Sequence, residues 1–308
     1  MPRPRTLALV PVAFVSGACA QDVPLADRLD EAPPEETIQT PEQLAEEVLP
    51  GWTLKLDPAV SYFALSGDIE VPGSAASGAG TPFDLGELNL DSPGLAPFGR
   101  LQLARGDFRA SFTGATARTN REAAISSPGR LGPATVLAGD VIESDLSFQI
   151  FDLSASYRVF SRAYRDDITE PVRLAVSLHV LGGLRFYNVS YEGSVSPLGA
   201  GVRPAGSPLS TSTDQFFAEP ILGAQLDVEI FERFSVEFTG SVGGFVAGDR
   251  TSASLEAGVG FTVRPVPNFG ATIGYRILAF GLEDDDGFDS FEWDGAIAGL
   301  FWGIQLRF

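Results

Sequence analysis

The feature that most limits how this chain can fold is a strict alternation of apolar and polar residues in segments 218–230 and 234–246. Even-numbered positions hold residues such as Leu222, and none of them carries a charge. Odd-numbered positions include the acidic residues Asp227 and Glu237. A period of two residues is that of a β-strand, whose successive side chains point to opposite faces of the sheet. Because only a short link joins the segments, they predict two antiparallel strands that share one uncharged face.

The same alternation recurs along the chain and predicts ten strands. The segments lie at about 52–66, 95–104, 107–117, 143–160, 172–187, 218–230, 234–246, 253–263, 269–279 and 293–308. The connections near 104–107, 161–170, 231–233 and 265–268 are short or moderate, and those near 67–94, 118–142 and 188–215 are long and rich in Gly, Ser and Pro. Short turns at one end and long loops at the other are typical of bacterial outer-membrane barrels.

The expected fold is therefore all-β, a single closed antiparallel transmembrane β-barrel of about ten strands, with eight or twelve as alternatives. A soluble β-sandwich also alternates, but it turns its charges toward water and its apolar face inward. Here one strand face is consistently Leu, Val, Phe and Ile, and the other holds the charges. An apolar face of this kind suits lipid outside and a polar lumen within.

The segment 143–160 contains a change of phase. Leu146, Phe148 and Ile150 share one parity, whereas Phe151 and Leu153 take the other. A β-bulge near Ile150 would produce this switch. A long strand whose upper half projects beyond the membrane is an equal alternative.

The first 50 residues predict export and an acidic extension. Residues 1–20 have the charged start, apolar core and small-residue cleavage site of a signal peptide, with lipidation of Cys19 as the alternative. Residues 21–50 form an acidic, proline-bearing periplasmic segment, either a solvated tail or a plug, and residues 51–308 form the barrel. Removal of residues 1–20 leaves no cysteine, so we expect no disulfide.

The net charge of the chain argues against nucleic acid as a binding partner. The formal charge of −19 offers no electrostatic footprint for nucleic acid. The charged groups of the polar strand faces are expected to line the lumen. They are Arg100, Arg109, Arg173, His179, Arg185, Asp227, Glu229, Glu237, Glu256, Arg264, Arg276 and Arg307. Since charges of both signs pair across strands and a ten-stranded barrel is narrow, we expect a largely filled lumen. The sequence therefore favours a narrow, porin-like pore passing small solutes, or a structural barrel of the envelope.

Two other functions stay open as alternatives. His179 is the only histidine, and with Ser177 two residues away it could serve a lipid- or peptide-hydrolysing barrel enzyme. Its expected position deep in the lumen is poor for such substrates, so we predict no enzyme, no cofactor and no metal. The acid-rich stretch 283–294 lacks the spacing of a calcium-binding EF-hand loop. The long loops could instead bind a partner at the cell surface.

Aromatic residues near the expected strand ends predict interfacial girdles in the membrane. They are Trp52, Tyr62, Tyr157, Tyr275, Trp293 and Trp302.

The chain ends in "WGIQLRF", which resembles the C-terminal β-signal of outer-membrane barrels at Gly303, Ile304, Leu306 and Phe308. Segment 172–308 is also similar to a group of uncharacterised bacterial outer-membrane barrel proteins. It shares strands with a "GxR" pattern at 183–185, a "GSVGGF" strand at 240–245 and a "GYR" strand at 274–276. The resemblance implies location in the bacterial outer membrane with both termini periplasmic. It also implies contact with outer-membrane lipid, lipopolysaccharide and the barrel insertion machinery.

Overall fold

The computed structural model of the chain describes residues 51–74, 79–164, 173–198, 206–285 and 290–308. The predicted signal peptide and acidic segment lie outside these ranges. The elements described are β1 (Thr53–Glu70), β2 (Phe83–Asp84), β3 (Gly94–Arg105), β4 (Phe108–Ala124), β5 (Gly129–Leu131), β6 (Ala134–Val136), β7 (Val141–Tyr164), β8 (Leu174–Ser196), β9 (Ser210–Ile230), β10 (Phe234–Ala247), β11 (Arg250–Val266), β12 (Phe269–Asp284) and β13 (Phe291–Arg307). Within these ranges no helix has the length and apolar character needed to cross a membrane.

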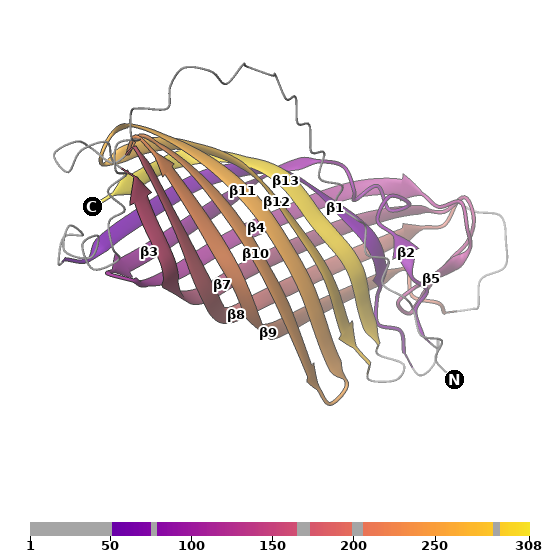
Figure 1. Cartoon of the computed structure of the whole chain (residues 1–308). Helices are drawn as coiled ribbons and strands as arrows, with labels where there is room; N and C mark the ends of the chain where they lie inside the picture. Colours follow the sequence, from indigo (N-terminus) through magenta and orange to yellow (C-terminus); the bar gives the residue numbers. More distant parts are fainter. Residues whose placement is uncertain (1–50, 75–78, 165–172, 199–205, 286–289) are drawn as a thin grey trace, which may run out of the picture. The chain divides into compact units, whose positions relative to one another are not determined.

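Ten of these strands form one closed barrel (Figure 1). The order is β1, β3, β4 and then β7 to β13, each strand pairing antiparallel with its neighbours. β13 returns to pair with β1, from Lys55 opposite Arg307 to Glu70 opposite Glu292, so the barrel has no seam. The short β2 adds to β1, and β5 pairs only with β6. The predicted closed, ten-stranded antiparallel barrel is confirmed.

The barrel has two unlike ends. At one end, here called the turn end, β3–β4, β9–β10 and β11–β12 are joined by short turns at 106–107, 231–233 and 267–268. Phe231 and Glu232 both have positive φ, the geometry of a type I′ hairpin turn, which suits the right-handed twist of the strands. The opposite end, here called the loop end, carries β2, β5, β6 and the longer connections.

Several strands are longer than the sequence predicted. β7, β8 and β9 have 24, 23 and 21 residues, whereas about 9–11 tilted residues cross the hydrocarbon layer. β4 continues to Ala124, β8 continues to Ser196, and β9 already begins at Ser210. The predicted long loops at 118–142 and 188–215 are therefore wrong over much of their length. These strands project beyond the lipid-facing part of the barrel.

The change of phase in segment 143–160 does not come from a bulge. The pairing of β7 with β4 and β8 runs without interruption past Ile150, and the register shift lies between Arg158 and Phe160. Phe148 and Ile150 face inward and are buried, while Phe151 and Leu153 face outward and are exposed. The bulge near Ile150 is thus wrong, and the alternative of a long projecting strand describes the structure.

The phase change reflects a change of environment along one continuous strand. Below Ile150, toward the turn end, β7 is apolar outside and polar inside. Above it, Ile142, Leu146 and Phe148 point inward and are buried, while Glu143 and Gln149 point outward.

The other long strands change in the same way. On β8 the inward residues pass from Arg185 to Tyr187, Val189 and Tyr191, and on β12 from Arg276 to Leu278. The loop-end half is therefore built like a water-soluble sheet, and the turn-end half is built like a membrane barrel.

The loop-end interior is a packed apolar core. Its centre is an aromatic cluster in which Trp293 lies edge-on to Phe148 and Phe280, with ring centroids 5.0 and 4.9 Å apart. Leu85 and Leu131, from the β1–β3 and β4–β7 connections, are fully buried against the same core. Trp293 is therefore not part of an interfacial girdle, and that part of the prediction is wrong. The other five predicted girdle residues are exposed.

Candidate functional site: the charged lumen

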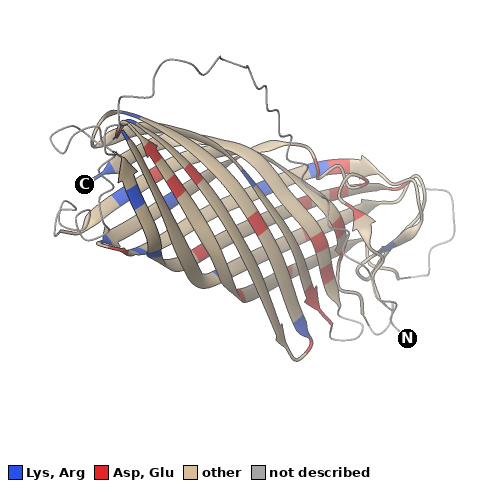
Figure 2. Cartoon of the chain, in the orientation of Figure 1, with Lys and Arg blue, Asp and Glu red and all other residues tan. Residues whose placement is uncertain are grey.

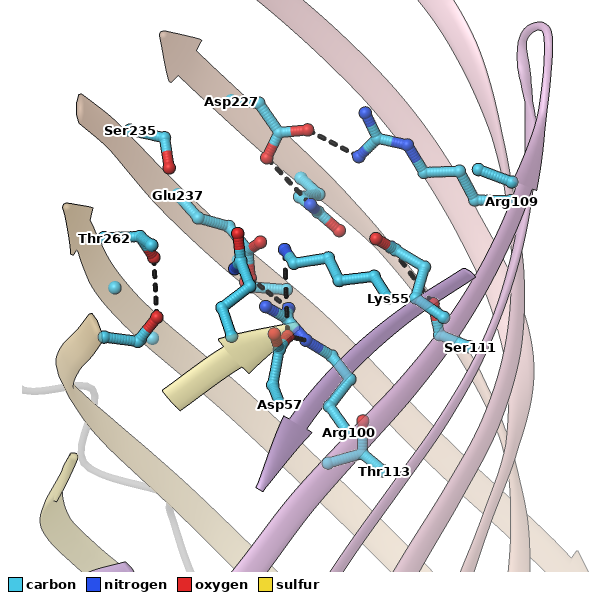
Figure 3. Close-up of a pocket in the computed structure, with 18 of the residues that line it drawn as sticks. Lys55, Asp57, Arg100, Arg109, Ser111, Thr113, Asp227, Ser235, Glu237 and Thr262 are labelled. Carbon is cyan, nitrogen blue, oxygen red and sulfur yellow. Dashed lines mark hydrogen bonds and ion pairs between the residues drawn. The ribbon is translucent and has the colours of Figure 1, made fainter. Parts of the chain in front are cut away.

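The turn-end half of the lumen contains a cavity of about 380 Å³. Figure 3 shows charged side chains from β1, β3, β4, β9 and β10 pointing toward one another around it. Ten of the twelve predicted lumen charges line it: Arg100, Arg109, Arg185, Asp227, Glu229, Glu237, Glu256, Arg264, Arg276 and Arg307. Arg173 is exposed in the connection before β8, so its expected position on an inward strand face is wrong. His179 is buried beside the cavity but does not line it.

The first charged cluster joins β1, β3 and β10. The Arg100 guanidinium donates a hydrogen bond to Asp57 at 2.9 Å and a second to Glu237. The Lys55 ammonium lies 3.7 Å from the same Asp57 carboxylate. Two cations thus meet two carboxylates, which leaves this part of the lumen electrically balanced.

The second cluster joins β4 and β9. Asp227 accepts hydrogen bonds from Arg109 at 2.5 Å and from Gln225 at 2.8 Å. The Nε2 atom of His179 lies 3.6 Å from the same carboxylate, outside hydrogen-bond distance. Among the described residues, neither ring nitrogen of His179 has a hydrogen-bond partner. Within the described residues, no hydroxyl is therefore hydrogen-bonded to the imidazole.

The third cluster crosses the lumen at the boundary with the apolar core. Arg185 is fully buried and donates hydrogen bonds to Asp152 at 2.7 Å, to Ser254 at 3.0 Å, and to Glu256. Arg276 lies 2.8 Å from Asp152 and 2.7 Å from Glu256. A buried charge is tolerated only when it is paired and hydrogen-bonded, and both guanidinium groups meet this condition.

Above Arg185 the acidic residue Glu219 closes the polar layer. Its carboxylate accepts hydrogen bonds from Tyr187 at 2.7 Å and from Ser254. A Cβ at Gly243 on the neighbouring β10 would lie 2.5 Å from a carboxylate oxygen of Glu219, so a larger residue there would require this side chain to shift. Tyr187 packs its ring into the aromatic cluster and its hydroxyl into the polar layer, so it connects the two interiors.

Four charged residues of these clusters were absent from the predicted lumen set: Lys55, Asp57, Asp152 and Glu219. Asp152 shares the parity of Ile150, and the change of phase concealed that this parity faces inward from Ile142 to Arg158, where the register shifts. Across the residues that the structure describes, no group of three or more His, Cys, Asp or Glu is arranged to hold a metal ion. Most of the charged groups that line the lumen form ion pairs with one another.

The outer surface of the turn-end half is apolar on every strand. Leu101, Phe112, Leu153, Phe238 and Ile273 are examples of side chains that leave between about one third and two thirds of their surface exposed. Within the predicted C-terminal signal, Ile304 and Phe308 are exposed and Gly303 packs against β1. Phe308 also exchanges backbone hydrogen bonds with Leu54 of β1. A closed sheet with an apolar exterior and a polar lumen is a transmembrane β-barrel, since only closed sheets and helices satisfy the backbone in lipid.

No protein-family model matches the chain, and no curated protein matches it. Among solved structures, it is similar to the outer-membrane protease OmpT of Escherichia coli, with 11% identity, a TM-score of 0.44, and coverage of 85% of this chain and 99% of that one. It is also similar to the attachment invasion locus protein Ail of Yersinia pestis (12% identity, TM-score 0.32, coverage 83% and 99%). The toluene transporter TodX of P. putida matches with 11% identity, a TM-score of 0.27, and coverage of 87% and 92%. At these scores the similarities carry no argument, and the assignment of class rests on the strand pairing and the two surfaces.

Proposed function

We propose that this protein is a non-enzymatic outer-membrane barrel that conducts no solute and holds a rigid β-sheet outside the bilayer. The observation that carries the proposal is the double closure of the lumen. Coming from the turn end, a solute meets the Arg185–Asp152–Glu256 layer and then the aromatic cluster around Trp293.

The narrow-pore alternative requires a polar path through both layers. The core residues Ile69, Leu146, Phe148 and Trp293 are at most 1% exposed, so the loop-end interior is dry and tightly packed. Packed apolar interiors leave few voids larger than a water molecule. This favours the structural role over the pore.

The hydrolase alternative receives no support from the surroundings of His179. A general base must lie within hydrogen-bond distance of the proton that it removes. The imidazole is buried beside Asp227, whereas lipid or peptide substrates arrive at the lipid-facing surface or at the loop end. We therefore assign His179 a packing role beside Asp227.

For orientation we propose that the turn end faces the periplasm and the loop end faces the cell exterior, as short turns and long loops do in bacterial barrels. Single cysteines at Asp107 and Ser212 test this in intact cells with a membrane-impermeant maleimide. Labelling of Ser212→Cys alone is expected, and labelling of Asp107→Cys alone would reverse the orientation.

Conductance tests the proposed closure. The purified barrel in planar bilayers is expected to give no discrete current steps. A variant with Arg185→Ser and Glu256→Ser, which removes the ion pair but keeps the aromatic cluster, is expected to stay closed as well. Heat-modifiable gel migration verifies that both proteins are folded. Reproducible current steps from the unmodified barrel would rule out the structural role.

A further inference from the structure

The upper half of β9 is a free sheet edge. Its pairing with β8 continues from Ile230 up to Ser210 opposite Ser194. Its pairing with β10 stops at Ile221 opposite Gly243. Figure 1 shows the β10–β11 hairpin, in orange, leaving the long strands at this level. Along Ser210–Pro220, no strand within the described part of the chain pairs with the side of β9 that faces away from β8.

The pairing pattern shows which backbone groups this edge presents. Leu209 and Phe231, just beyond the two ends of β9, both form backbone hydrogen bonds with the β8 side. Because the β8–β9 register has no shift, odd-numbered residues of β9 bond to β8, and even-numbered residues direct their N–H and C=O groups to the other side. Pro220, which has no N–H, is even-numbered, so its missing donor faces β10 at the level where that ladder stops.

The free edge is therefore formed by the backbone groups of Ser210, Ser212, Asp214, Phe216 and Ala218. Most of these residues have exposed side chains. An exposed row of unpaired N–H and C=O groups is a template for a further strand. Phe216, which is 54% exposed and stacked on Phe186, adds an apolar surface beside it.

The charges around the edge define the partner. Figure 2 shows acidic residues in both halves of the barrel, including the strands of the loop end. On the outer face of β7 to β9, Glu143, Asp145, Glu192 and Asp214 all point to solvent. Asp145 and Glu192 lie directly opposite each other, and Arg118 of β4 pairs with Asp145, so the row keeps more acidic than basic groups. A hollow lined by Glu143, Asp145 and Glu192 adjoins Ser210 and Ser212 at the start of the edge.

We infer that the β9 edge binds an extended peptide segment with basic side chains at alternate positions, by strand addition. Backbone hydrogen bonds supply the affinity, and basic side chains on the outer face meet the acidic row. A second copy of this chain fits less well, because edge-to-edge pairing would bring two acidic faces together. The inference goes beyond the proposed function and rests on it only in placing the loop end outside the bilayer. Conductance and strand addition are therefore tested separately.

The experiment uses the full barrel in nanodiscs of zwitterionic lipid and a fluorescent decapeptide of alternating Lys and Val. Fluorescence anisotropy is expected to show saturable binding, which empty nanodiscs do not show. A peptide of the same sequence with N-methyl groups on the edge-facing amides is expected to bind at least about tenfold more weakly, because it lacks the donors of strand addition. A Glu–Val peptide is expected not to bind.

The matched variants are Ser212→Pro and Ser212→Ala. Proline removes an N–H from the free edge only and leaves the β8 ladder intact, so binding is expected to fall about tenfold, whereas alanine should leave it within about twofold. Equal binding of the N-methylated peptide, or no binding of the Lys–Val peptide, would overturn the inference even if the proline variant misfolds. Cross-linked dimers that are lost in Ser212→Pro and kept in Ser212→Ala would assign the edge to a second copy and also overturn it.

Discussion

The two halves of the lumen share long strands such as β7 and β8 but have opposite interiors. In the turn-end half, Arg100, Asp227 and their neighbours fill the interior with ion pairs, and the outer face is apolar. In the loop-end half, Phe148, Trp293 and their neighbours form a dry core, and the outer face is polar. The boundary crosses β7 between Ile150 and Asp152 and β8 between Arg185 and Tyr187.

Alternation along a strand determines which residues share a face, but it does not determine which face is inside. Lipid accepts apolar side chains and rejects charges, so charges turn inward where lipid surrounds the barrel. Water reverses the preference, and the hydrophobic effect then drives the apolar residues of the same strand inward. An uninterrupted strand that passes from lipid to water must therefore exchange the polarity of its two faces, as β7 does.

The largest expected effect comes from the centre of the apolar half. Trp293→Ala is expected to lower the free energy of unfolding by about 3–5 kcal/mol, because it leaves a cavity in a packed aromatic cluster. Urea titration of the barrel in lipid vesicles measures the loss. Trp302→Ala, a change of the same size on the lipid-facing surface of the same strand, is the control and should cost clearly less. Equal losses of unfolding free energy in the two variants would contradict the description of a packed apolar core in the loop-end half.

An intermediate effect is expected from charges placed on the outer face of β7. Leu153→Arg puts a cation against lipid and is expected to destabilise the barrel by about 2–4 kcal/mol if it lies near the bilayer midplane. Gln149→Arg, four residues away on the same face, lies on the loop-end side of the boundary and should be tolerated. Folding yield in vesicles and urea midpoints measure both variants. A destabilised Gln149→Arg together with a tolerated Leu153→Arg would place the boundary elsewhere.

The smallest effect is expected at the exposed pair of the loop-end half. Arg118 donates a hydrogen bond to Asp145 at 2.8 Å on the outer surface, in water. Exposed ion pairs contribute little, since solvent and salt screen them. Arg118→Ala should therefore leave the urea midpoint unchanged within error. A large loss of stability would indicate that lipid or protein covers this surface.

The sequence predicted the closed barrel, the number of strands and the position of most lumen charges. It did so because a long uncharged strand face is visible in the sequence as an alternation of period two. It did not predict the strand ends. In segments 118–124 and 188–196 the outward residues are polar or small, so a search for apolar lipid-facing positions assigns these segments to loops. Trp293 was misplaced for a related reason, since closeness to a strand end does not show which face a side chain lies on. The parity of its position shows the face: Trp293 and Trp302 have opposite parity on β13, so they lie on opposite faces.

The sequence could not predict which charged residues pair with one another in the lumen. Arg185 and Asp152 are 33 positions apart and meet because the β7–β8 register places them directly opposite each other. Arg276 joins them from a strand 124 positions away from Asp152. Such contacts depend on register and barrel closure, which the alternation of one strand does not encode.

The most direct measurement of the change of environment is cysteine labelling along the outer face of β7. The chain without residues 1–20 contains no cysteine, so single cysteines at 145, 147, 149, 151, 153, 155 and 157 report one position each. A water-soluble maleimide applied to the barrel in lipid vesicles should label positions 145 to 149 and spare positions 151 to 157 near the lipid. Protection of 145 and 147, or free labelling of 153 and 155, would contradict the account that water surrounds one half of the barrel and lipid the other.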